Sequence, residues 1–173
     1  MEKDIKYRKH GNRDDLAGEY VWGDAGQIIL FLIFLTVWIT DSFIFKYSTF
    51  FSNYIPFYIR LPIALMILSV SAYFAKVGLR IVFDEIREQP IVIRKGVFNL
   101  VRHPIYLGSL LFYLGLCVLT ISIFSILIWF GIIVFYHFIS KYEEKILVNK
   151  FGADYEKYQN EVPMWIPRFR TGI

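Results

Sequence analysis

The sequence predicts an all-α integral membrane protein, a bundle of four transmembrane helices whose last two form a helical hairpin. Three observations predict this fold class. The chain of 173 residues is 56% hydrophobic and only 20% charged, whereas soluble domains are about 25% charged. Long stretches carry no formal charge, and lysine and arginine gather in alternate segments between them. The single cysteine, Cys117, excludes a scaffold held by internal disulfides.

Uncharged runs define the four helices in order. The three longest runs cover residues 25–40, 61–75 and 104–140. A bilayer core requires about 20 helical residues, and the first two runs reach that length with their flanks. The third run is too long for one span, at about 55 Å as a helix, so we expect a break at Thr120–Ser122. Phenylalanine and isoleucine cover every face of these segments, which argues against a buried bundle in a soluble protein. The predicted spans are about 25–45, 56–77, 104–119 and 122–141.

The basic residues predict the orientation of the helices. Of the 19 lysines and arginines, 17 lie in the two terminal tails and in the middle loop, which a four-span topology places on one side. Basic segments stay in the cytoplasm, so both termini are predicted to be cytoplasmic in a multi-pass protein. The net charge of +4 then reflects orientation and attraction to anionic lipids, and we expect no nucleic-acid partner. The chain is predicted to be one membrane domain, residues 1–173, with a charged tail (1–24), two N-terminal spans (25–77) and a C-terminal region (78–173).

Polar chemistry is concentrated on either side of the predicted hairpin. Arg102 and His103 directly precede Pro104, a residue favoured in the first turn of a helix. The free N–H groups and partial positive charge of a helix start suit an anionic or carboxylate-bearing ligand. The alternative is that Arg102 reaches lipid headgroups and His103 caps the helix.

A second polar segment extends the fourth span into the cytoplasm and carries Glu143 and Glu144, with Gly152 predicted to end the helix. Adjacent helical residues point about 100° apart, so at most one glutamate is expected to face His103. Acids at a membrane boundary need partners, and salt bridges to nearby lysines are the alternative to a binding role. The proline- and aromatic-rich tail from Tyr155 to Phe169 is predicted to be irregular, on the membrane surface or over the pocket. The sequence has no Cys/His cluster with zinc spacing, so we expect no metal.

Taken in order, these residues resemble the isoprenylcysteine carboxyl methyltransferase and phospholipid methyltransferase superfamily. The resemblance covers about half of the chain, from Phe83 to Phe169. It implies an integral-membrane enzyme that uses S-adenosylmethionine, held in a cytoplasmic pocket within residues 78–173 rather than on a Rossmann fold. The motifs that carry it are Gly96-Val97-Phe98, Arg102-His103-Pro104-Ile105-Tyr106, Glu143-Glu144, Phe151-Gly152-Ala153-Asp154-Tyr155, Tyr158, Val162-Pro163 and Ile166-Pro167.

The resemblance also implies site residues. A glutamate suits the ammonium group of the cofactor, and the rings of Phe98 and Tyr106 suit its adenine or ribose. Arg102 and Glu144 are the predicted catalytic residues: Arg102 would orient an anionic group, and Glu144, or else His103, would act as base for an amine acceptor. The implied cofactor-binding residues are Pro90, Ile91, Val92, Ile93, Phe98, His103, Pro104, Ile105, Tyr106 and Glu143.

The predicted reaction is methyl transfer to a lipophilic acceptor at the membrane: a prenylcysteine-like carboxylate, a phospholipid amine or a related small lipid. Ile139 stands where prenylcysteine-type members place an arginine that meets the substrate carboxylate, so the acceptor stays open. Two alternatives remain, an NADPH-dependent reductase of the sterol-reductase type and a non-catalytic membrane binding protein. The compact length and the glutamate pair favour methyl transfer. A structure in which His103 and Glu143 diverge would exclude the enzyme.

Overall fold

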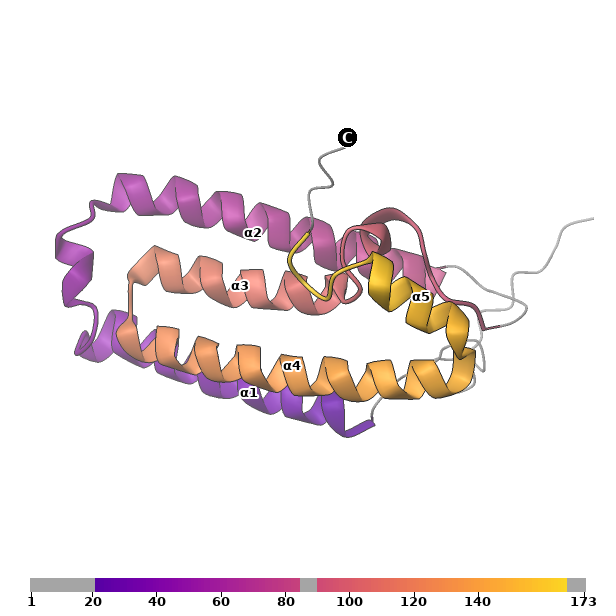
Figure 1. The fold of residues 1–173 in the computed structure, drawn as a ribbon. Helices are drawn as coiled ribbons and strands as arrows, with labels where there is room; N and C mark the ends of the chain where they lie inside the picture. Colours follow the sequence, from indigo (N-terminus) through magenta and orange to yellow (C-terminus); the bar gives the residue numbers. More distant parts are fainter. Residues whose placement is uncertain (1–20, 85–89, 168–173) are drawn as a thin grey trace, which may run out of the picture.

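The computed structural model describes residues 21–84 and 90–167, and every regular element within these two ranges is helical, as predicted (Figure 1). Residues 1–20 of the predicted charged tail lie outside the described residues. The long helices are α1 (Val21–Ile39), α2 (Phe57–Leu79), α3 (Pro104–Thr120) and α4 (Ile123–Phe151), followed by the shorter α5 (Ala153–Glu161). The short π- and 3-10 helices are η2 (Thr40–Phe45), η3 (Phe50–Asn53), η4 (Arg80–Asp84) and η5 (Gly96–Asn99).

The four long helices lie side by side and alternate in direction (Figure 1). The start of α1, the end of α2, the start of α3 and the end of α4 gather at one end, beside α5. We call this the α5 end. The opposite end, which we call the turn end, holds η2, η3 and the connection between α3 and α4. Polar side chains carried by different helices therefore meet at the α5 end.

Three helical segments are long and apolar enough to cross a membrane: Ala25–Phe45, Phe57–Phe83 and Ile123–Phe151. Large apolar side chains on them face outward, and Ile28, Met66 and Phe138 are 61%, 63% and 68% exposed. Such a surface is stable in lipid rather than in water, so the chain is a membrane protein. The apolar helix α3 has 17 residues, about 26 Å, slightly less than a hydrocarbon core of about 30 Å.

The predicted helix boundaries are confirmed where local chemistry determines them. The third and fourth helices separate at Ile121, which has a left-handed backbone (φ 52°). Ser122 caps the new helix, because its side chain accepts a hydrogen bond from the Ser125 backbone N–H. Pro104 occupies the first turn of α3, and Gly152 ends α4 with a positive φ of 55°. The fourth predicted span continues as α4 to Phe151.

A buried cluster at the turn end joins η2 to the start of α4. The Asp41 carboxylate, 3% exposed, accepts hydrogen bonds from the backbone N–H of Ser48 (3.0 Å) and from the hydroxyls of Ser48 and Ser122 (2.6 Å for Ser122). Ser48 in turn accepts a bond from the Phe124 N–H at 3.1 Å. This acid faces the partial positive charge of a helix start, so the cluster fixes the hairpin turn against the end of the first helix.

Candidate functional site

The segment between α2 and α3 brings its polar residues to the α5 end. Residues 90–93 have no regular structure, and η5 follows them, starting at Gly96 with a φ of 55°. The half-buried Phe98 in η5 is tied to α5, because the Tyr158 hydroxyl donates to the Phe98 carbonyl at 2.6 Å. Arg102 and His103 then lead directly into α3.

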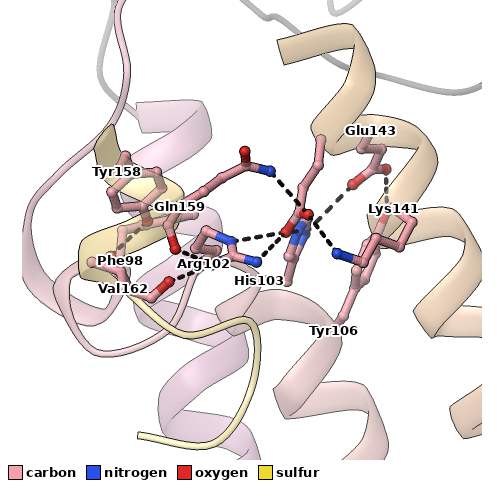
Figure 2. A network of polar contacts seen from close by, with 10 residues as sticks. Phe98, Arg102, His103, Tyr106, Lys141, Glu143, Tyr158, Gln159 and Val162 are labelled. Atoms are coloured by element: carbon pink, nitrogen blue, oxygen red, sulfur yellow. Dashed lines mark hydrogen bonds and ion pairs between the residues drawn. The ribbon is translucent and has the colours of Figure 1, made fainter. Parts of the chain in front are cut away.

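His103 contacts both glutamates of α4, and Figure 2 shows the one with Glu143. Its Nδ1 is 3.6 Å from Glu143 Oε2, and its Nε2 is 3.3 Å from Glu144 Oε1. The expectation that only one glutamate faces this histidine is therefore wrong. An imidazole has nitrogens on two edges, so carboxylates that diverge on the helix can contact one ring from two sides.

Burial decides the charge of this histidine. His103 is 8% exposed, and its burial lowers its pKa below the ordinary value of 6.5, although the hydrogen bond and charge of Glu144 oppose that change. The ring is therefore neutral at pH 7. One nitrogen of a neutral imidazole donates and the other accepts, which leaves this residue able to take up a proton.

Tyr106 and Glu143 form the inner part of the site. The Tyr106 hydroxyl donates to the Glu143 carboxylate. The Tyr106 ring lies parallel to the His103 ring, with 5.6 Å between their centroids, and its centroid is 5.0 Å from that of the Tyr136 ring. Glu143 is 16% exposed at its side chain. A carboxylate and two stacked rings at a helix start are the groups that the resemblance associates with a cofactor.

Arg102 and Glu144, the predicted catalytic residues, bind each other. Arg102 Nε and Nη2 lie 2.8 and 2.7 Å from Glu144 Oε1, with side chains 9% and 3% exposed. Arg102 Nη1 donates to the carbonyls of Gln159, at 2.9 Å, and Val162. Glu144 also accepts from Gln159 Nε2 at 3.1 Å and lies 3.6 Å from Lys141 Nζ. Through these contacts the pair holds the C-terminal tail, and Figure 2 shows Arg102 beside Gln159 and Val162 of that tail.

The tail crosses the start of α3. The backbone N–H groups of Arg102 and His103 donate to the carbonyls of Pro163 (2.9 Å) and Met164 (3.3 Å). The expected irregular tail is only partly confirmed, because residues 153–161 form α5 and only 162–167 are irregular; residues 168 and 169 lie outside the described part. Tyr155 and Tyr158 are one turn apart and both buried, and this spacing is the signal from which the helix could have been predicted.

The other predicted site residues are less closely joined to this group. Ile91 is 58% exposed, and Pro90, Val92 and Ile93 are half-buried along the loop. Ile105 packs against Gly78 of α2. A Cβ added to Gly78 would lie only 2.9 Å from Cγ1 of Ile105. The buried Pro104 packs at the same place, with its Cγ 3.6 Å from that Cβ position. Both residues therefore join α3 to α2.

The sequence did not single out Gln159, Trp165 or a nearby cavity of about 470 Å³. The cavity lies between η5 and the tail and is lined by residues that include Asn99, Asn160 and Pro163, but by no predicted site residue. Within residues 21–84 and 90–167, no three His, Cys, Asp or Glu side chains are placed to hold a metal ion.

Comparison with known proteins connects this site to a reaction class. A model of the phospholipid methyltransferase family matches residues 61–154, more than half of the chain. Protein-S-isoprenylcysteine O-methyltransferase of Saccharomyces cerevisiae is 35% identical over 80 residues, 44% of this chain and 33% of that protein. Its counterpart in Schizosaccharomyces pombe is 33% identical over 89 residues, covering 50% and 37%.

A third relative has a different kind of acceptor in its name. Methanethiol S-methyltransferase of a Pseudomonas species is 30% identical over 118 residues, 65% of this chain and 44% of that protein. The chain therefore matches less than half the length of each of these curated relatives. All three similarities are to methyltransferases, while the named acceptors differ.

Proposed function

Because the chain belongs to the phospholipid methyltransferase family, we propose that it transfers a methyl group from S-adenosylmethionine to a lipophilic acceptor at the membrane. The observation that carries this proposal is the convergence of His103, Tyr106 and Glu143 at the start of α3. The names of the relatives support the reaction class and leave the acceptor open between a carboxylate and a thiol.

The residues at the α5 end fit this cofactor by their chemistry. Glu143 provides a carboxylate for an ammonium group, and the rings of Tyr106 and Phe98 provide surfaces for adenine or ribose. The N–H groups at the start of α3, together with His103, suit a carboxylate, and residues 90–93 would form the outer wall. When bound, the cofactor supplies a methyl group already activated on a sulfonium, so the chain mainly provides proximity and alignment.

The same proposal includes a four-span topology with the α5 end in the cytoplasm. Among the described residues, Lys46 and Arg60 are the basic residues of the turn end, and the other nine lysines and arginines lie toward the α5 end. This asymmetry is typical of a cytoplasmic face. A water-soluble cofactor would then enter from the cytoplasm, and the acceptor would enter from the bilayer.

The two alternatives have less support. The NADPH-dependent reductase is not favoured, since the family match and the three relatives are all methyltransferases. Divergence of His103 and Glu143 would have excluded the enzyme in favour of a non-catalytic binding protein, and instead His103 Nδ1 lies 3.6 Å from Glu143 Oε2. Calorimetry with S-adenosylhomocysteine and with NADPH separates the two enzymes, and we expect binding of the first only.

The decisive test removes one carboxylate. In detergent-solubilised protein, Glu143→Ala should weaken S-adenosylhomocysteine binding by about tenfold or more, as expected for loss of a charge-assisted hydrogen bond. Glu161→Ala is the matched control, because this exposed acid at the same end pairs with Arg94 at 3.3 Å. Unchanged binding by Glu143→Ala would overturn the site. Radiolabelled S-adenosylmethionine incubated with a lipid extract then identifies the acceptor through its labelled product.

A further inference from the structure

Two buried polar atoms near the site have no hydrogen-bond partner among the residues that the structure describes. One is Oγ of Ser140, a residue with 0% exposure in α4. The other is Nε1 of Trp165 in the tail. Buried polar atoms are nearly always paired, and leaving one unpaired is unfavourable. Two unpaired atoms in one region are therefore available to hydrogen-bond a ligand.

Both atoms belong to the region around His103. Ser140 lies one turn before Glu144 and one turn after Tyr136, so the three share a face of α4. On that face Tyr136 contacts Tyr106, and Glu144 contacts His103. Ser140 therefore faces the start of α3.

Trp165 reaches the same turn of α4 from the tail. Trp165 follows Met164, whose carbonyl accepts a hydrogen bond from the His103 N–H. The centroid of the Trp165 ring lies 5.9 Å from that of the His137 ring. His137 and Ser140 are three residues apart and so are neighbours on the helix. We call the group formed by Ile139, Ser140 and Trp165 the Ser140 subsite.

The chemistry of the Ser140 subsite selects among acceptors. Its polar groups are the Ser140 hydroxyl, which can donate or accept, and the indole N–H, which only donates; Ile139, next to Ser140 in the sequence, is apolar and 6% exposed. The cations of this region, Arg102 and Lys141, pair with Glu144: Arg102 Nη2 lies 2.7 Å from Oε1, and Lys141 Nζ lies 3.6 Å from Oε2. A carboxylate buried here would need a charge partner. An ammonium has three N–H donors to satisfy, and this group provides only the Ser140 oxygen as an acceptor.

We propose that the Ser140 subsite binds the methyl acceptor and that this acceptor is a neutral alkyl thiol. This inference rests on the proposed function. The cysteine thiol has an ordinary pKa of about 8.5 and a simple alkyl thiol is less acidic, so an alkyl thiol enters an apolar site uncharged at pH 7. Its sulfur accepts weak hydrogen bonds, which satisfies the Ser140 hydroxyl and the Trp165 N–H.

The reaction balances with the groups present and the proposed methyl donor. The thiol loses its S–H proton to His103, and the carboxylates of Glu143 and Glu144 stabilise the resulting imidazolium before the proton passes to water. The acceptor sulfur forms a bond to the methyl carbon while the bond from that carbon to the donor sulfonium breaks. The products are a methyl thioether, the neutral thioether S-adenosylhomocysteine and one proton.

The test compares three ligands with the same alkyl chain. Full-length protein in detergent, saturated with S-adenosylhomocysteine, is heated with 1-hexanethiol, hexanoate or hexylamine at pH 7 under reducing conditions. A ligand that binds the folded state raises the Tm, and a tighter ligand gives the same increase at a lower concentration. We expect the thiol to raise the Tm at a concentration at least tenfold below that of either competitor. An equal or stronger effect of hexanoate or hexylamine would overturn the thiol assignment.

Variants test the residues themselves. Ser140→Ala and Trp165→Phe should each require about three- to tenfold more thiol for the same Tm increase, the usual effect of one hydrogen bond. Ser69→Ala, which removes an exposed hydroxyl bonded to the Leu65 carbonyl, should respond like the wild type. A wild-type response from both subsite variants would overturn the subsite. If S-adenosylhomocysteine binds and the thiol does not, this inference alone fails; if S-adenosylhomocysteine does not bind, the proposed function fails.

Discussion

At the level of single residues, the contacts of Arg102 and Glu144 indicate a structural role that the sequence did not predict. Both charges are buried, and such a pair is stable only when its hydrogen bonds are satisfied. Glu144 has Arg102, His103, Gln159 and Lys141 as partners. The pair therefore connects α3, α4 and the tail, and it fixes His103 beside Glu143.

Removing the arginine should destabilise the whole bundle. Arg102→Ala leaves the Glu144 charge buried beside a weaker set of partners, and breaking a buried pair typically costs about 3–5 kcal/mol. Glu161→Ala, which breaks the exposed pair with Arg94, should cost about 0–1 kcal/mol. Unfolding of the two variants in mixed micelles measures this difference. Equal losses for both variants would refute the structural role.

The buried histidine makes stability depend on pH. Because burial lowers the folded-state pKa of His103 below 6.5, the unfolded chain binds more protons as the pH falls through 6.5. Stability should therefore be highest above pH 6.5 and fall below it. His103→Gln should flatten this slope below pH 6.5. A slope that survives His103→Gln would exclude this residue as its origin.

At the level of secondary-structure elements, close packing of α2 against α3 depends on Gly108. A Cβ at this position would lie 2.9 Å from the Ala75 backbone nitrogen and 3.0 Å from the Ser71 carbonyl oxygen. The Ser71 hydroxyl also donates to the Gly108 carbonyl at 2.7 Å. This close contact fixes the start of α3, and with it His103, against α2.

A methyl group at Gly108 should force the two helices apart. We expect Gly108→Ala to cost about 1–3 kcal/mol of stability, as overpacking of a close contact does, and to weaken S-adenosylhomocysteine binding. Gly131→Ala in α4 is the control, since nothing lies within 4 Å of its added Cβ. There the higher helix propensity of alanine should stabilise by up to about 1 kcal/mol. Denaturant titration of both variants distinguishes packing from propensity, and a destabilised Gly131→Ala would contradict this account.

The sequence predicted elements well where one residue determines the backbone. Pro104, Ser122 and Gly152 set helix ends by local chemistry, and all three ends are confirmed. It did not predict α5, because a polar helix of nine residues is marginal by itself and forms here through burial of Tyr155 and Tyr158. The shared contact of both glutamates with His103 also required the three-dimensional position of the ring. The unpaired atoms of the Ser140 subsite, Ser140 Oγ and Trp165 Nε1, could not be predicted either, because their burial depends on tertiary packing.

At the level of the whole molecule, the two ends of the bundle differ in charge and in chemistry. The turn end contains the internally bonded Asp41 cluster, and Arg60 there donates to the Leu119 carbonyl at 2.6 Å. That contact satisfies a free carbonyl near the C-terminus of α3. The α5 end carries nine of the eleven described basic residues. A bundle with this asymmetry should insert with the α5 end in the cytoplasm.

Cysteine labelling tests this orientation with little background, because Cys117 is the only cysteine in the chain and is 2% exposed. Tyr54→Cys introduces a thiol at the turn end, where Tyr54 is 81% exposed, and Lys157→Cys introduces one on the exposed face of α5. A membrane-impermeant maleimide should label Tyr54→Cys in intact cells and Lys157→Cys only after lysis. Wild-type protein should stay unlabelled in both conditions. Labelling of Lys157→Cys in intact cells would place the proposed cofactor site outside the cytoplasm, where S-adenosylmethionine is not supplied, and would contradict the topology and the function together.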